Sequence, residues 1–178
     1  MVYQTLVQIV EQVNSIVSEL IKAEILENDN TSQTFEEQME EMELKYLYRP
    51  EVGNVAFASA IDCWSFTLPG FIPNVAQKLN MNGKALLKFM WDPYYYNAAN
   101  KQVSRNPPTT SSKVMFVQFI MDALVDRYLK FFNPEVIHNT VKCREAHSTV
   151  KEKLSKIMPM EHGIFKMVVD HLPAPIDA

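Results

Sequence analysis

The sequence predicts a mainly helical α/β fold in which one short core strand is flanked by amphipathic helices. The strand is expected at Val55–Ala58, an apolar run entered through Gly53-Asn54 that is typical of a buried strand. The 178 residues are 47% hydrophobic and 21% charged, which suffices for one domain with a core. Near the N-terminus, apolar residues recur at helical spacing and predict an amphipathic helix over residues 3–20 (Leu6, Ile9, Val10, Val13, Val17 and Leu20).

The remaining elements follow from periodicity and from turn residues. Residues 28–33 (NDNTSQ) end the first helix, and the acidic run at 36–43 predicts either a solvated short helix or a disordered excursion. A short strand is expected at 94–96, and a polar loop at 97–112. Further helices are expected, in chain order, over residues 71–79, 84–90, 114–132, 135–139, 142–156 and 164–172.

Charge and composition narrow the classes of function. With a net charge of −4 and a pI near 5.6, the chain has no bulk attraction to nucleic acid, so DNA is not expected as a partner. The two cysteines, Cys63 and Cys143, lie far apart, which favours a reducing, cytoplasmic setting. The N-terminus lacks the features of a secretory signal. The most apolar window, 114–132, contains charges such as Asp122 and Arg127, so we expect a core helix and no membrane partner.

The expected strand ends in the small residues Ser59-Ala60, which let a ligand approach the backbone closely. On this pair alone, an ordinary strand ending in a turn is the better interpretation. The residues that follow, 61–66 (IDCWSF), add a more specific signal. Together, Ser59-Ala60 and this tract resemble the translational GTPases, in which a strand ending in Ser-Ala or Ser-Gly forms one wall of the guanine pocket.

Two families of translational GTPase share this tract. The ribosomal translocase, eukaryotic elongation factor two, usually has Ser-Gly-Leu-His-Gly-Trp. The elongation-factor-like GTPase that matures the large ribosomal subunit has Ser-Ala-Ile-Asp-Gly-Trp, so Ala60, Ile61 and Asp62 favour the maturation GTPase. Cys63 departs from both families, which carry glycine there. We expect Cys63 to be a small buried hydrophobe whose side chain tightens or shifts the turn.

The resemblance extends over nearly the whole chain. Residues 3–20 are similar to the helix that follows the families' Asn-Lys-x-Asp motif. Lys88–Tyr96 resembles a Leu-Trp-Gly-Asp-Tyr-Tyr stretch, with Asp92-Pro93 in place of Gly-Asp. Phe116–Ile120 matches the opening of a following helix, and residues 171–175 resemble the Leu-Pro-Ser-Pro exit from the nucleotide domain.

This resemblance implies a partial P-loop GTPase domain with a mainly helical insertion subdomain. Residues 1–61 would be the C-terminal part of the GTPase domain, including a variable acidic loop at 27–45. Residues 62–157 would be the insertion subdomain, and residues 158–178 the closing helix and a linker. The strand at 55–58 would then belong to a sheet whose other strands lie mostly in a missing N-terminal part.

By the same resemblance, Ser59, Ala60 and Ile61 form part of a site for GTP or GDP. The backbone N–H near Ala60 would donate to the 6-oxo group of guanine and reject the amino group of adenine. The rest of the site is missing from this sequence, since it has no G-x-x-x-x-G-K-[ST] loop, no Asp-x-x-Gly switch and no Asn-Lys-x-Asp motif. We identify no catalytic residue and no ligand for magnesium, so GTP hydrolysis and Mg²⁺ binding are expected only in the full-length protein.

The resemblance also implies partners. The full-length protein would act on the maturing large ribosomal subunit and, with the Shwachman–Diamond protein, release an anti-association factor. Two alternatives stay open: a fragment of the translocase, or a truncated, non-catalytic module that binds the ribosome or another protein. The lysine-rich residues 142–156 are the candidate ribosomal contact, against the plainer interpretation of a solvated helix face.

Two further groups of residues have plainer explanations. His138, Cys143 and His147 fall at spacings that a zinc site could use, but scattered His and Cys without paired motifs are more often structural. Trp91 and Tyr94–Tyr96 could stack on RNA bases, yet aromatic residues more often pack in a core. We therefore expect no metal and a packing role for the aromatic residues.

Overall fold

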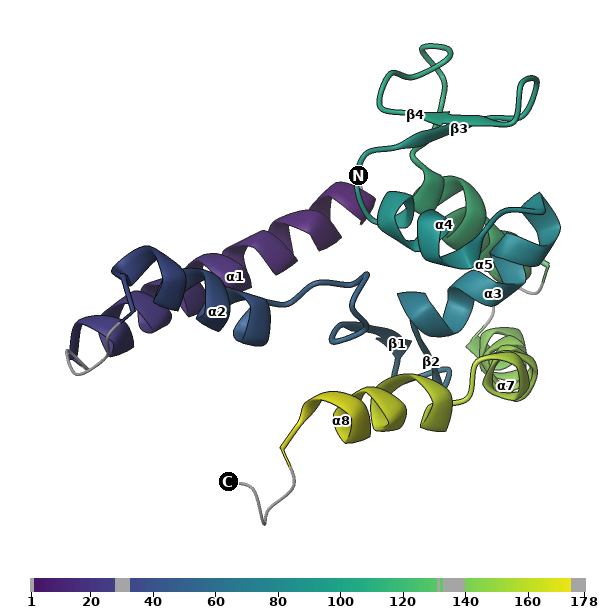
Figure 1. Cartoon of the computed structure of the whole chain (residues 1–178). Coiled ribbons are helices and arrows are strands. Elements are labelled where there is room, and N and C mark those ends of the chain that lie inside the picture. The colour runs from purple at the N-terminus through teal and green to yellow at the C-terminus, as the bar shows by residue number, and fades with distance from the viewer. Residues whose placement is uncertain (1, 28–32, 131, 133–139, 174–178) are drawn as a thin grey trace. The chain divides into compact units, whose positions relative to one another are not determined.

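The chain forms two compact units, Met1–Arg49 and Pro50–Ala178 (Figure 1). The computed structural model describes residues 2–27, 33–130, 132 and 140–173. Helices occur in both units, and every strand of the described residues lies in the second unit. The predicted mixture of helix and strand is therefore confirmed, whereas its assignment to a partial P-loop GTPase domain remains a proposal.

The N-terminal unit consists of two helices that lie side by side, α1 (Val2–Glu27) and α2 (Phe35–Tyr46). The first predicted helix is confirmed and continues to the end of α1. The acidic run at 36–43 forms most of α2. Thr34 begins this helix with a reciprocal cap: its hydroxyl accepts from the N–H of Glu37 at 3.3 Å, and its N–H donates to the Glu37 carboxylate at 2.9 Å. The acidic run is thus a helix and not a disordered excursion.

Polar contacts close this helical pair and leave much of the apolar stripe of α1 uncovered. The side-chain amide of Asn14 donates to the carbonyl oxygen of Tyr48 at 2.9 Å and accepts from its N–H at 2.8 Å. Of the α1 residues, Ile21 and Ile25 are buried. Six large apolar residues of α1 remain exposed (Val2, Ile9, Val13, Ile16, Leu20 and Leu26). Of the six residues whose spacing predicted the helix, three are therefore exposed (Ile9, Val13 and Leu20) and three are half-buried (Leu6, Val10 and Val17).

A two-stranded hairpin in the C-terminal unit carries the predicted strand. β1 (Ala56–Ser59) pairs antiparallel with β2 (Trp64–Thr67), in a register that places Ser59 opposite Trp64. The strand predicted at 55–58 is confirmed, but the prediction that it is buried is wrong. No β1 residue is fully buried, whereas three of the four β2 residues are. The reason is that η2, α3 and α7 pack against β2, whereas β1 packs mainly against β2 and η2.

The C-terminal segment packs against this hairpin. The π-helix η2 (Glu161–Phe165) continues into α8 (Lys166–His171), which confirms the last predicted helix. Residues of η2 contact both β1 and β2. The three domain segments inferred from the sequence thus meet at one small sheet, and their boundaries after residues 61 and 157 stay predictions.

Further helices surround the core of the C-terminal unit. They are α3 (Leu68–Leu79), α4 (Gly83–Met90), the π-helix η1 (Val117–Met121), its continuation α5 (Asp122–Leu129), and α7 (Thr140–Ile157). α3 begins earlier than predicted because the Thr67 hydroxyl caps it by accepting from the N–H of Gly70 at 3.4 Å. The helix predicted at 135–139 lies outside the described residues. Within the part of the chain that is described, no helix has the length and apolar character needed to cross a membrane.

A second hairpin corrects one prediction. β3 (Tyr95–Asn97) confirms the short strand expected at 94–96, and it pairs antiparallel with β4 (Gln102–Ser104). The polar loop predicted at 97–112 therefore contains a strand. Because β4 is short and mostly polar, it shows no alternation of apolar residues by which the sequence could have revealed it.

Aromatic rings pack against one another beside this core, where Phe116 is fully buried and Phe57 and Trp91 are half-buried. Phe57, Trp91 and Phe116 contact one another, with ring centroids 5.2 to 5.6 Å apart. Tyr94 and Tyr96 pack edge-on against neighbouring phenylalanine rings at 4.8 and 5.6 Å. These contacts confirm the packing role predicted for the aromatic residues.

Candidate functional site

The predicted nucleotide-binding residues lie where β1 turns into β2. Residues 60–63 connect the two strands, and we call residues 59–63 the hairpin turn. Ser59 is half-buried, whereas Ala60 and Ile61 are exposed, Ile61 to 75%. The turn therefore presents Ala60 and Ile61 at the surface.

Cys63 ends the turn in the left-handed conformation, with φ of 52°. Repulsion between Cβ and the backbone makes this conformation costly for residues other than glycine. The glycine of the two similar families is the residue that such a position favours. The Cys63 side chain is half-buried, and its Sγ lies 3.5 Å from the carbonyl oxygen of Ala60. The prediction of a buried hydrophobe is therefore wrong.

Asp62 is the buried residue of the turn, with 4% of its surface exposed. Its carboxylate accepts from the Ser59 hydroxyl at 3.2 Å, and the same hydroxyl accepts from the Asp62 backbone N–H at 3.3 Å. Short polar side chains often stabilise turns in this way. The reciprocal contact fixes the internal shape of the turn and occupies the Ser59 hydroxyl.

Two residues from distant helices complete the surroundings of Asp62. Tyr128 of α5 donates its hydroxyl proton to Asp62 Oδ2 at 2.5 Å and accepts from the indole N–H of Trp64 at 2.8 Å. His147 of α7 places Nδ1 2.9 Å from Asp62 Oδ1. We call these five residues the Asp62 cluster (Ser59, Asp62, Trp64, Tyr128 and His147).

Hydrogen bonding keeps the buried carboxylate of this cluster ionised. Burial by itself would raise the pKa of Asp62, but hydrogen bonds from Tyr128, His147 and Ser59 outweigh it and hold the pKa below its ordinary value of 3.8. Burial, together with the hydrogen bond to this carboxylate, raises the pKa of the Tyr128 phenol. The cluster thus holds a buried negative charge surrounded by donors, which is the arrangement that makes such a charge tolerable.

The C-terminal segment holds β2 by close backbone contacts. The Ser65 hydroxyl accepts from the N–H of Ile164 at 3.1 Å and donates to the carbonyl oxygen of Met160 at 3.3 Å. A Cβ atom on Gly163 would lie 2.1 Å from Ser65 Oγ. Any side chain at position 163 would therefore force η2 away from β2.

The structure joins residues that the sequence analysis did not connect. Tyr128 and His147 lie 66 and 85 residues from Asp62 along the chain, and no local pattern in α5 or α7 marks them. The available signal was Asp62 itself, an acid in an apolar tract that needs partners once it is buried. The nucleotide contacts predicted for Ser59, Ala60 and Ile61 remain a prediction.

The histidines and cysteine at zinc-like spacing do not form a site among the described residues. His138 lies outside those residues, and Nδ1 of His147 is engaged by Asp62. The Cys143 thiol is half-buried and forms no disulfide. In the described ranges, no group of three or more His, Cys, Asp or Glu side chains could hold a metal ion.

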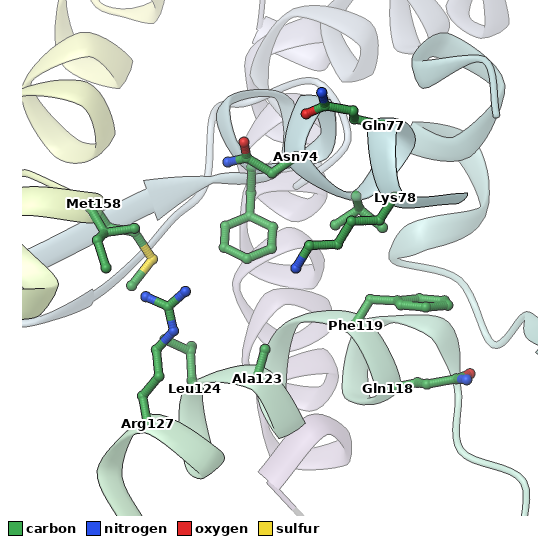
Figure 2. Close-up of a pocket in the computed structure, with 12 residues that line it drawn as sticks. Asn74, Gln77, Lys78, Gln118, Phe119, Ala123, Leu124, Arg127 and Met158 are labelled. Atoms are coloured by element: carbon green, nitrogen blue, oxygen red, sulfur yellow. The ribbon is translucent and has the colours of Figure 1, made fainter. Parts of the chain in front are cut away.

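A cleft of about 500 Å³ is lined by residues of α3, η1, α5 and the end of α7 (Figure 2). Lys78 of α3 and Arg127 of α5 extend into this space, which is also lined by the aromatic residues Phe71 and Phe119. No carboxylate lines it, and neither cation forms an ion pair with a described residue. We call this feature the cationic cleft. Its charge favours an anionic ligand.

Comparison with known proteins identifies relatives over nearly the whole chain. The chain is 30% identical, over 98% of its residues, to a segment of elongation factor-like GTPase 1 from Homo sapiens, and equally to the protein of that name from Mus musculus. It is 26% identical, over 97% of its residues, to a segment of ribosome assembly protein 1 from Schizosaccharomyces pombe. No protein-family model matches it.

The chain is therefore a relative of proteins named elongation factor-like GTPase 1 and ribosome assembly protein 1. It is homologous to one segment of the elongation factor-like GTPases, which confirms the resemblance seen in its sequence. The chain spans 18% of the length of each of these relatives. The alignment with the human protein covers 206 positions, more than the 178 residues of the chain, so that relative carries additional residues within the segment.

Proposed function

We propose that the chain is the base-reading part of the GTP-binding domain of a cytoplasmic ribosome-assembly GTPase. The backbone N–H of Ala60 would donate to the 6-oxo group of guanine, with Ser59 and Ile61 beside it. The observation that carries the proposal is that Ala60 and Ile61 are exposed residues next to Asp62, which is buried and held by hydrogen bonds. Recognition of a base by main-chain donors requires this combination of access and fixed position.

The remaining parts of the nucleotide site would come from chain outside this segment. The P-loop, the Asp-x-x-Gly switch and the Asn-Lys-x-Asp motif do not occur in the sequence, and these elements hold the phosphates, Mg²⁺ and the far side of guanine. The curated relatives are more than five times as long as the segment they share with this chain. GTP hydrolysis would accordingly belong to the longer protein.

Exposed apolar surface in the C-terminal unit supports the proposal that the rest of the nucleotide site lies outside this segment. Phe165 of η2 is 60% exposed and Val169 of α8 is 80% exposed, and Leu172 is exposed just beyond α8. The outer edge of β1 also lacks a partner strand among the described residues. An unpaired strand edge beside exposed apolar side chains favours association with further structure. The missing strands and helices of the GTP-binding domain are the cover that we propose.

The surroundings of position 62 favour the maturation GTPase over the translocase. In this position the resemblance gives aspartate for the maturation GTPase and histidine for the translocase. Asp62 accepts hydrogen bonds from Ser59, Tyr128 and His147 through two oxygens. A neutral histidine offers one acceptor nitrogen and could not serve all three donors. The longer protein would therefore act on the maturing large ribosomal subunit and, with the Shwachman–Diamond protein, release an anti-association factor.

Calorimetric titration with GDP tests the proposal. The chain by itself is expected to show no micromolar binding, because it lacks the phosphate cradle. In a longer protein that includes the P-loop, Ala60→Pro removes the backbone donor and should weaken GDP binding about tenfold, whereas Ala60→Ser keeps the donor and the affinity. Equal GDP affinity in the two variants would contradict the proposed contact.

The cationic cleft supports a second candidate, a non-catalytic module that binds an acidic surface of the ribosome or of a partner protein. Lys78 and Arg127 lack ion-pair partners among the described residues. Co-sedimentation of the chain with large ribosomal subunits should then be lost in the Lys78→Glu, Arg127→Glu double variant. A control variant carries Lys84→Glu and Lys88→Glu on α4, outside the cleft. Co-sedimentation of the cleft variant at the level of the unmodified chain would exclude this candidate.

A further inference from the structure

We propose that Asp62 is a positioning residue that fixes the hairpin turn to helices α5 and α7, so that these helices set the affinity and selectivity for guanine. The proposal rests on the proposed contact between the turn and guanine. It assigns to Tyr128 and His147 a role in nucleotide recognition although neither would touch the nucleotide.

The first step is that the turn is anchored through one side chain. Ala60 and Ile61 are exposed, and the Cys63 thiol contacts the carbonyl oxygen of Ala60 within the turn itself. Asp62 alone among these four residues reaches other elements of the fold, through Tyr128 and His147. The position of the turn relative to the helices therefore depends on the Asp62 carboxylate, together with the bond from Trp64, the residue after the turn, to Tyr128.

The second step is that local and distant contacts do different things. The reciprocal bonds between Ser59 and Asp62 set the shape of the turn, because both residues lie in it. The bonds from Tyr128 and His147 set its place, because they come from separate helices. A hydrogen bond to guanine weakens steeply when the donor is misaligned, so both shape and place matter for recognition.

The third step is that the helices and the turn are expected to move together. If α7 shifted alone, the buried carboxylate would lose the donor of His147, and leaving such a charge short of a partner is costly. A displacement of α7 is therefore expected to move Ala60 as well, because moving the turn costs less free energy than separating His147 from Asp62. By linkage, nucleotide binding at the turn would in turn bias the position of α7.

Nucleotide affinities in the longer protein test the proposal. Tyr128→Phe and His147→Ala each remove one donor, and each should weaken GDP binding at least about fivefold. Both should also reduce the ratio of GDP to ADP affinity, which a general loss of stability would not change. His147→Asn keeps an amide donor in place of Nδ1. It should restore most of the GDP affinity and most of the ratio of GDP to ADP affinity. Tyr95→Phe and His162→Ala are matched controls outside the cluster and should leave both quantities unchanged.

The reactivity of Cys63 gives a readout that does not depend on nucleotide. In the chain carrying Cys143→Ser, Cys63 is the single cysteine. Its rate of thiol labelling should rise severalfold with His147→Ala and Asp62→Asn, and should return toward the original rate with His147→Asn. An unchanged rate in all three variants would show that the helices do not hold the turn, and would overturn the inference.

The outcomes separate this inference from the proposed function. If the unmodified longer protein fails to bind GDP, the proposed function fails and this inference with it. If it binds GDP selectively but the Tyr128 and His147 variants keep the original affinity and selectivity, only this inference fails. Loss of affinity with an unchanged ratio of GDP to ADP, in variants that retain their helical signal, would also reject the positioning role.

Discussion

The Asp62 cluster and the cationic cleft lie in the same unit and treat charge in opposite ways. In the cluster, a buried carboxylate is surrounded by three side-chain donors. In the cleft, Lys78 and Arg127 share an open space without a carboxylate to pair with among the described residues. A buried, fully partnered charge contributes to one fixed structure, whereas open and unpaired charges contribute little to stability and remain available to a ligand. The two sites should therefore respond very differently to substitution.

The largest expected effect lies where η2 supports the strand next to the cluster. Gly163→Ala would place Cβ 2.1 Å from Ser65 Oγ and 2.6 Å from the Ser65 carbonyl carbon, so backbone would have to move. We expect the free energy of unfolding to fall by about 3 kcal/mol, measured by urea denaturation. Gly83→Ala is the matched control, since its nearest contact would be 3.6 Å away. A similar loss in both variants would show that close packing at Gly163 is not the cause.

The next largest effect breaks the cluster itself. Asp62→Ala leaves the hydroxyl of Tyr128 and the ring of His147 without their acceptor, and we expect a loss of about 2 kcal/mol in urea denaturation. Asp126→Ala removes an exposed acid of α5 and should change stability by less than about 0.5 kcal/mol. Equal effects of the two variants would mean that the Asp62 hydrogen bonds carry no net stability.

Acid should weaken the cluster in a predictable direction. The pKa of Asp62 is lower in the folded chain than its ordinary value of 3.8, so near and below that pH the unfolded chain binds more protons. The contribution of Asp62 is therefore complete above pH about 4 and is lost as the pH falls through the folded pKa. Unfolding measured between pH 6 and pH about 3 should show a steeper loss for the unmodified chain than for Asp62→Asn.

Glu152 provides the control for this pH dependence. Its pKa is also lowered, by the hydrogen bond and charge of Lys156, but the pair is exposed to water. Glu152→Gln should therefore leave the pH profile of stability almost unchanged. A profile flattened as much by Glu152→Gln as by Asp62→Asn would place the acid sensitivity elsewhere.

A smaller effect of opposite sign is expected at the end of the turn. Cys63 has a φ of 52°, so Cys63→Gly removes a steric conflict and should raise the free energy of unfolding by about 0.5 to 1 kcal/mol. The same replacement within α7, Cys143→Gly, should lower it by about 1 kcal/mol, because glycine is unfavourable inside a helix. Thermal denaturation of both variants should show this reversal. A loss at both positions would contradict the strain assigned to Cys63.

The helices of this chain could be predicted because their information is local. Apolar spacing located α1, and the caps and prolines around α3 and α4 placed them to within a few residues. The sequence did not predict β2. The turn before it ends in Cys63, whereas a glycine at that position would have indicated a hairpin. The burial expected for β1 depended on neighbouring strands, and among the described residues β1 pairs with β2 alone.

The candidate site shows the same contrast between residues that a local sequence pattern indicates and residues that only the structure reveals. Ser59 to Ile61 were found because a short tract resembles a known turn, and that tract is contiguous in sequence. The donors to Asp62 come from α5 and α7, and a tyrosine or histidine on a helix has many ordinary roles. Contacts across such separations are decided by tertiary packing, which leaves no periodic trace in the sequence.

The smallest expected effect on stability belongs to the cationic cleft. The Lys78→Gln, Arg127→Gln double variant keeps much of the aliphatic stems and removes both charges, so the free energy of unfolding should change by less than about 0.5 kcal/mol. Urea denaturation beside Asp62→Ala measures the contrast directly. A loss above about 2 kcal/mol would mean that these cations are held by the fold as firmly as the Asp62 carboxylate. A negligible loss, combined with weaker sedimentation with large ribosomal subunits, would show that the cleft serves binding and that the cluster serves structure.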